Sequence, residues 1–142
     1  WDPLVVKQPR LELKHRRNNV GAKTIYDVNE FAFDDLSALS KQVNELSGTY
    51  AFLQPTLQNS YKRAYFGTRD KKFRITIDWD LSYASLLTTR QFRKHQQFEP
   101  DIHILEVKYE QELEEEADRI SQFFPFRSTK NSKYVTGVEL CV

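Results

Sequence analysis

Ionised side chains alternate with apolar ones in several short segments of this 142-residue chain. Glu12 and Lys14 are separated by one leucine, and Glu106 and Lys108 are separated by one valine. The segment 73–78 has arginine, threonine and aspartate at alternate positions. Because alternate residues of a β-strand point to the same side, each segment predicts a strand with one charged face and one apolar face.

Cations gathered on such faces could bind several phosphate groups, since arginine contacts phosphate oxygens bidentately and lysine acts as a point charge. Glu106 could hold Mg²⁺ or Mn²⁺ bridging those phosphates. A closed barrel can turn charged faces inward only around water or a charged ligand, because each unpaired buried ion costs several kcal/mol. The basic residues expected in such a cavity are Lys14, Lys23, Arg63, Arg74, Lys108 and Lys133.

A simpler interpretation is an ordinary antiparallel sheet whose charged faces meet solvent. Solvated strand faces usually mix charged residues with Thr, Ser and Gln, whereas Glu-x-Lys occurs twice here and Arg-x-Thr-x-Asp once. This density of charge favours a polar interior.

Composition excludes several other classes of protein. The chain has 21 Lys and Arg against 20 Asp and Glu, a balance that argues against a nucleic-acid binder. Its apolar runs are too short for a membrane-spanning helix, so we expect no membrane insertion by this segment. Four glycines form no phosphate-binding loop, the three histidines lack metal-ligand spacing, and Cys141 has no partner for an internal disulfide. A single unpaired cysteine suits a reducing compartment, and we expect a cytoplasmic location.

Two helices are expected between the strands. The first has Asp34 as its N-cap, an apolar stripe from Leu36 to Leu46, and Gly48 as its stop. The second runs from about Glu112 to Phe124 and ends before a proline. Polar connections are expected at 88–100 and 128–132. The predicted strands are 11–16, 20–28, 61–66, 73–78, 105–109 and 134–140.

These elements predict a single α+β domain over residues 1–142, with about six antiparallel strands and two helices. Six of its segments resemble, in the same order, motifs of the VTC (vacuolar transporter chaperone) polyphosphate polymerase domain. That domain is a triphosphate tunnel metalloenzyme related to the CYTH group. The resemblance runs from about Leu11 to Val138, and the matching segments are 11–14, 21–23, 61–65, 73–78, 104–108 and 132–134.

The resemblance implies an antiparallel β-barrel with helices packed outside, enclosing a basic tunnel. There the γ-phosphoryl group of ATP would pass to a polyphosphate chain, with Mn²⁺ or Mg²⁺ as cofactor. Glu12 and Asp78 would orient the basic groups. The implied site residues are Lys14, Arg63, Arg74 and Lys133 as catalytic phosphate ligands, Lys23, Tyr61, Lys108 and Ser132 as substrate contacts, and Glu106 as the metal-binding carboxylate.

The chain departs from the family pattern before Leu11, where an earlier basic strand and an Arg-x-Arg strand are missing. Together with the start at Trp1 and the lack of Met, this predicts the C-terminal two-thirds of the domain and an incomplete barrel. We therefore expect phosphotransferase activity in the full-length parent.

Two alternatives remain open at this point. The same tunnel could hydrolyse triphosphate or nucleoside triphosphates, or it could be a non-catalytic phosphate- or polyphosphate-binding regulatory module. The sequence does not specify the oligomeric state.

Overall fold

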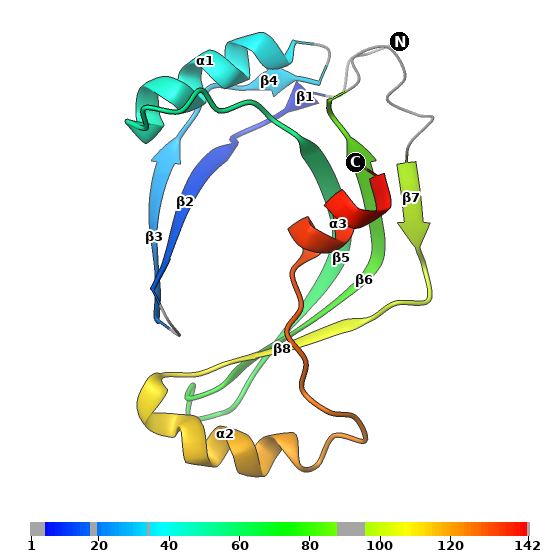
Figure 1. The fold of residues 1–142 in the computed structure, drawn as a ribbon. Helices are drawn as coiled ribbons and strands as arrows, with labels where there is room; N and C mark the ends of the chain where they lie inside the picture. Colours follow the sequence, from blue (N-terminus) through cyan, green and yellow to red (C-terminus); the bar gives the residue numbers. More distant parts are fainter. Residues whose placement is uncertain (1–4, 18–19, 34, 88–95, 142) are drawn as a thin grey trace. The chain divides into compact units, whose positions relative to one another are not determined.

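The computed structural model describes residues 5–17, 20–33, 35–87 and 96–141 (Figure 1). The chain divides into two compact units, residues 1–55 and 56–142. Within the described ranges, no helix has the length and apolar composition needed to cross a membrane.

The first unit is built on two antiparallel pairs of strands. β2 (Arg10–Arg17) and β3 (Val20–Asp27) form a hairpin, and β1 (Val5–Val6) pairs with β4 (Phe31–Ala32). The strands predicted at 11–16 and 20–28 are therefore confirmed.

Helix α1 (Leu36–Ser47) begins and ends with identifiable caps. A side-chain oxygen of Asp35 accepts a hydrogen bond from the Ala38 N–H, and Gly48 ends the helix in the left-handed conformation at φ 61°. The stop at Gly48 is confirmed. The N-cap predicted at Asp34 is wrong, because its neighbour Asp35 supplies the capping oxygen; Asp34 itself lies outside the described residues.

The second unit is organised around one long central strand. β6 (Arg74–Ser85) pairs on one side with β5 (Leu57–Gly67) and on the other with β7 (Gln96–Glu99) and β8 (Ile104–Lys108). All three pairings are antiparallel, and they confirm the strands predicted near 61–66, 73–78 and 105–109.

β7 corrects part of the connection that was expected over residues 88–100. This short strand pairs with the end of β6, and its Phe98 lies opposite Ser82. The rest of that segment, 88–95, lies outside the described residues.

A β-bulge divides β6 into two parts with different surroundings. The register with β5 shifts between Ser60 and Lys62, and Asp80 on β6 has a positive φ of 51°. Before the bulge, buried and partly exposed residues alternate along β6. Beyond it, every residue from Leu81 to Leu86 is buried, so the core of the second unit lies at this end of the strand.

The second predicted helix is shorter than expected. A 3₁₀ turn, η1 (Gln111–Leu113), leads into α2 (Glu114–Ser121), and Ala117 is its buried residue. Phe124 lies after the helix rather than in it, since the following proline disfavours helical backbone at the residue before it. The loop predicted at 128–132 is confirmed.

The strand predicted at 134–140 is wrong, because this segment forms helix α3 (Lys133–Cys141). The Val135 N–H donates to Ser132 Oγ at 3.4 Å, which is a typical N-cap contact. Gly137 is buried against Leu57 and Tyr83, so tertiary packing overrides the strand propensity of the β-branched residues.

The sequence-based fold class is confirmed in its coarse form, as α+β with antiparallel sheets. The described residues contain eight strands, some of them very short, and three α-helices. About six strands and two helices were expected. Pairings among these residues give three separate sheets and do not close a barrel. The barrel and its tunnel therefore stay predictions.

The close approach of α3 to the sheet predicts the effect of Gly137→Ala. The added Cβ would lie 2.5 Å from Leu57 Cδ2 and 2.6 Å from Tyr83 Cδ1, and the buried Tyr83 ring has little room to move. We expect a loss of about 1–3 kcal/mol in the free energy of unfolding, although alanine favours helices. Urea denaturation measures this loss of stability.

Glu139→Ala, at an exposed position of α3, is the control and should change stability by less than about 0.5 kcal/mol. Equal effects of the two substitutions would contradict the packing.

Candidate functional site

Strand register places most of the predicted site residues of the second unit on one face of its sheet. Residues directly opposite each other in antiparallel strands share a face, and so do alternate residues of one strand. The opposed pairs include Arg63 with Asp78 and Arg74 with Lys108. We call this side the polar face; it carries Tyr61, Arg63, Tyr65, Arg74, Thr76, Asp78, Glu106 and Lys108.

Part of the polar face is covered rather than solvated. Asp78 is only 1% exposed and Thr76 is 4% exposed, whereas Ile75 and Ile77 on the opposite face are less fully buried. Helix α3 packs against β5 and β6 on the polar face, where Gly137 lies over Leu57 and Tyr83. For Thr76 and Asp78, the interpretation of a simply solvated strand face is therefore wrong.

Asp78 lies at the centre of a cluster of ion pairs. Its Oδ1 is 2.5 Å from Arg63 Nε, and its Oδ2 is 2.7 Å from Arg63 Nη2 and 2.6 Å from Lys133 Nζ. The side chains of Arg63 and Lys133 are 21% and 17% exposed. We call Asp78, Arg63, Lys133 and Tyr61 the Asp78 cluster.

The ring of Tyr61 completes this cluster. The guanidinium carbon of Arg63 and the Nζ of Lys133 each lie 4.9 Å from the centre of the Tyr61 ring. Cations in this position are attracted by the face of an aromatic ring. Tyr61 therefore helps to hold both cations beside Asp78.

The electrostatics of the cluster favour binding of an anion. The hydrogen bond from Arg63 lowers the pKa of Asp78 against the opposing effect of burial, and Lys133 lowers it further. Asp78 in turn raises the pKa of Arg63. Two cations and one carboxylate leave one net positive charge. Arginine has five N–H donors and lysine has three, so donors remain for phosphate oxygens after Asp78 is satisfied.

Ser132 was predicted to contact substrate, and the structure gives it a structural contact. Its Oγ accepts from the Val135 N–H and its carbonyl oxygen accepts from the Thr136 N–H. These bonds fix the start of α3, and Lys133 is the first residue of that helix. Ser132 thus helps to place the Lys133 ammonium at Asp78.

The far end of the polar face is more open. Lys108 Nζ lies 3.5 Å from Glu106 Oε2, and both side chains are 46% exposed. Arg74 lies opposite Lys108, and no carboxylate in the described part of the chain pairs with it. Arg74 is therefore available to an external anion.

Glu106 was predicted to bind the metal. It lies opposite Thr76, whose Oγ1 is buried without a hydrogen-bond partner. No group of three His, Cys, Asp or Glu residues in the described ranges could hold a metal ion. Mg²⁺ and similar ions are often bound by one or two carboxylates plus substrate phosphates, so Glu106 fits an ion that is shared with a phosphate chain.

The remaining predicted residues lie together in the first unit. Lys14 and Lys23 are directly opposite each other on the β2–β3 hairpin. Glu12 shares their face; one of its oxygens is 2.9 Å from Lys23 Nζ and the other is 4.0 Å from Lys14 Nζ. The expectation that Glu12 orients basic groups agrees with these contacts.

A family comparison agrees with the order of these motifs. The family model described as VTC domain matches residues 4–142, which is nearly the whole chain. The chain belongs to the VTC domain family. The resemblance inferred from the motifs is thereby confirmed, and the VTC domain indicates a polyphosphate-related role. Comparisons with curated proteins and with solved structures gave no match.

Two residues of the VTC domain's polar face were not named as site residues from the sequence, although Thr76 was expected on the charged face of the segment 73–78. Tyr65 lies beside Arg63, with 5.8 Å between its ring centre and the guanidinium carbon, and Thr76 lies between Arg74 and Asp78 on β6. Tyr65 could have been found, because it follows Arg63 by two positions in a predicted strand. The burial of Thr76 had no signal in the sequence.

The Asp78 cluster predicts how stability depends on pH. Asp78→Asn keeps the side-chain shape but leaves two partly buried cations without their carboxylate, which should cost about 3 kcal/mol in the free energy of unfolding at neutral pH. Because folding lowers the pKa of Asp78, its contribution is present above the unfolded pKa of about 3.9 and is lost as pH falls through the folded pKa. Urea denaturation from pH 7 to pH 2 should therefore show a stability difference that shrinks in acid.

Asp80→Asn is the matched control for this prediction. Asp80 is on the same strand and forms an exposed ion pair, 2.7 Å from Lys62 Nζ. Exposed pairs contribute about 1 kcal/mol or less, and asparagine tolerates the positive φ of this position. If the two variants lost equal stability, the central role of Asp78 would be refuted.

Proposed function

We propose that this VTC domain binds chains of phosphate groups along its polar face and that the protein carrying it transfers the γ-phosphoryl group of ATP to polyphosphate. One observation carries the proposal. Predicted phosphate ligands from separate segments lie along one face of one sheet, where Asp78 orients Arg63 and Lys133 and Arg74 follows farther along the same face.

The proposed reaction is a direct phosphoryl transfer. A terminal oxygen of the polyphosphate chain forms a bond to the γ-phosphorus of ATP, the bond to the β,γ-bridging oxygen breaks, and ADP leaves with that oxygen. Such a reaction needs positioning and charge stabilisation more than covalent help from the protein. Arg63, Arg74 and Lys133 would supply both by donating to phosphate oxygens.

A metal ion fits the same scheme. Mn²⁺ or Mg²⁺ held by Glu106 and substrate oxygens would neutralise charge on the phosphate groups. In our proposal the polar face forms one wall of a basic tunnel. The roles of Lys14 and Lys23, in the first unit, as phosphate ligands stay predictions. A cytoplasmic location and the lack of a nucleic-acid partner stay predictions.

A non-catalytic polyphosphate-binding role is the second candidate. It is favoured by the pairing of Glu106 with Lys108, which engages the predicted metal ligand within the protein. Hydrolysis of triphosphate in the same site is the third candidate. The full-length parent, given ATP and Mn²⁺, distinguishes the three roles by its products: long chains, free phosphate, or neither.

Arg74→Gln tests the polar face without disturbing its internal ion pairs. Because no described carboxylate pairs with Arg74, its removal should leave the melting temperature nearly unchanged. The loss of a charge-assisted contact to phosphate should raise the Kd for inorganic tripolyphosphate about tenfold. Isothermal titration calorimetry measures this Kd for both the wild type and the variant.

The control is Arg119→Gln, an exposed residue of α2, which changes net charge equally. Helix α2 lines a pocket with Leu105 and Val107, on the face of β8 opposite to the polar face. The Kd of this control variant should stay within about twofold of the wild-type value, as expected for a remote surface charge. Unchanged binding in Arg74→Gln would refute the polar face as the phosphate site.

A further inference from the structure

A cavity of about 380 Å³ opens at the turn between β5 and β6, beyond the end of the polar face. Its lining includes four cations, Lys71, Lys72, Arg74 and Lys108, together with the carboxylates of Asp70 and Glu110. Lys71 and Lys72 belong to no predicted motif. An external ligand can use those charges that have no partner within the protein.

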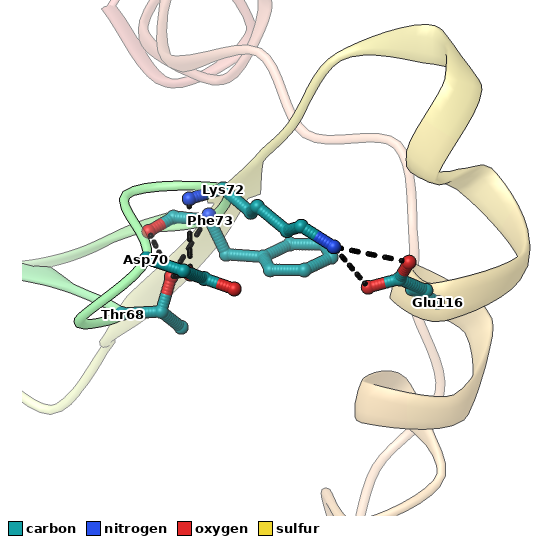
Figure 2. A network of polar contacts seen from close by, with 5 residues as sticks. All are labelled: Thr68, Asp70, Lys72, Phe73 and Glu116. Carbon is teal, nitrogen blue, oxygen red and sulfur yellow. Dashed lines mark hydrogen bonds and ion pairs between the residues drawn. The ribbon is translucent and has the colours of Figure 1, made fainter.

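The turn itself is held by a network of polar contacts (Figure 2). Thr68 Oγ1 donates to Asp70 Oδ1 at 2.5 Å and accepts from the Phe73 N–H at 3.1 Å. The Lys72 N–H also donates to Asp70 Oδ1, at 3.1 Å. The backbone around the cavity is therefore fixed by contacts within the turn.

Several charges around the cavity are already paired. Lys72 Nζ lies 3.4 Å from both oxygens of Glu116 on α2, as Figure 2 shows, and Lys108 pairs with Glu106. Asp70 accepts from Thr68 and Lys72, which lowers its pKa. Each of these groups has a partner within the protein.

Lys71 and Arg74 differ from the other lining cations. Neither pairs with a carboxylate anywhere in the described ranges. Lys71 also has a positive φ of 61°, a conformation that costs a non-glycine residue about 1 kcal/mol or more. Glu110 also lines the cavity, and no described cation pairs with it, but the lining has four cations against two carboxylates. The excess of positive charge, with two cations free of carboxylate partners, favours binding of an anion.

The spacing along β6 indicates how long that anion must be. Arg74 lies four residues from Asp78, and strands rise about 3.3 Å per residue, so the two positions are about 13 Å apart. Lys71 precedes Arg74 by three residues, in the turn before β6, so it lies farther from Asp78 than Arg74 does. A triphosphate bound at the Asp78 cluster is too short to contact Lys71. An extended chain of phosphates can contact both ends.

We propose that this cavity is a second subsite, the turn subsite, for a long phosphate chain that also contacts the Asp78 cluster. The inference rests on the proposed function and adds a preference for long chains over triphosphate. In the turn subsite, Lys71 contacts phosphates that a short ligand does not possess. Arg74 lies between the two regions and contacts both kinds of ligand.

Lys71→Asn tests the turn subsite. Asparagine removes the charge and tolerates positive φ, so the turn should keep its shape. Calorimetric titration of the full 142-residue chain uses two probes, inorganic tripolyphosphate and long-chain inorganic polyphosphate. We expect the Kd for the long chain to rise about threefold, as for the loss of one exposed charge contact, and the Kd for tripolyphosphate to stay unchanged.

Arg69→Asn is the matched control, since Arg69 lies exposed in the same turn and does not line the cavity. It should leave both Kd values unchanged. An equal loss in Arg69→Asn, or an unchanged long-chain Kd in Lys71→Asn, would overturn the turn subsite while leaving the proposed function intact. If the wild type bound neither probe, the proposed function would fail, and the inference would fail with it.

Discussion

Asp78 is charged and almost completely buried, and this combination constrains much of the second unit. An ionised carboxylate in that position is tolerable only when hydrogen-bonded cations replace the water it has lost. Arg63 meets the requirement only if β5 and β6 pair in the observed register, and Lys133 meets it only if α3 begins beside the sheet. The site and the fold thus depend on the same contacts.

The alternation of charged and apolar residues correctly predicts which side chains share a face, because it depends on the local geometry of a strand. The charged faces of the segments 73–78 and 105–109 lie together as expected, because the side-chain period of a strand is two and antiparallel pairing preserves the face. The capped ends of α1 could also be read from sequence, apart from the choice between two adjacent aspartates. That choice depends on backbone angles that residue types alone do not specify.

The sequence-based predictions that are wrong concern features that depend on long-range packing. Val135 and Thr136 favour a strand by propensity, and the fit of Gly137 against Leu57 and Tyr83, together with the N-cap at Ser132, explains why the segment is helical. The meeting of Lys133 with Asp78 follows from that helix, so it could not be derived from the spacing of either motif. Family resemblance named these residues as site residues without showing which of them touch.

The division of one edge of β6 between β7 and β8 bears on the order in which the second unit folds. β5 and β6 are neighbours in the sequence and can pair after closing a short turn, whereas β7, β8 and α3 must return to β6 from increasing distances along the chain. Closing longer loops has a higher entropic cost before any contact forms. The β5–β6 hairpin is therefore the expected nucleus, and Lys133 reaches Asp78 late. Until then Arg63 is the carboxylate's only partner among the cluster's cations, so native electrostatics are completed in the last stage of folding.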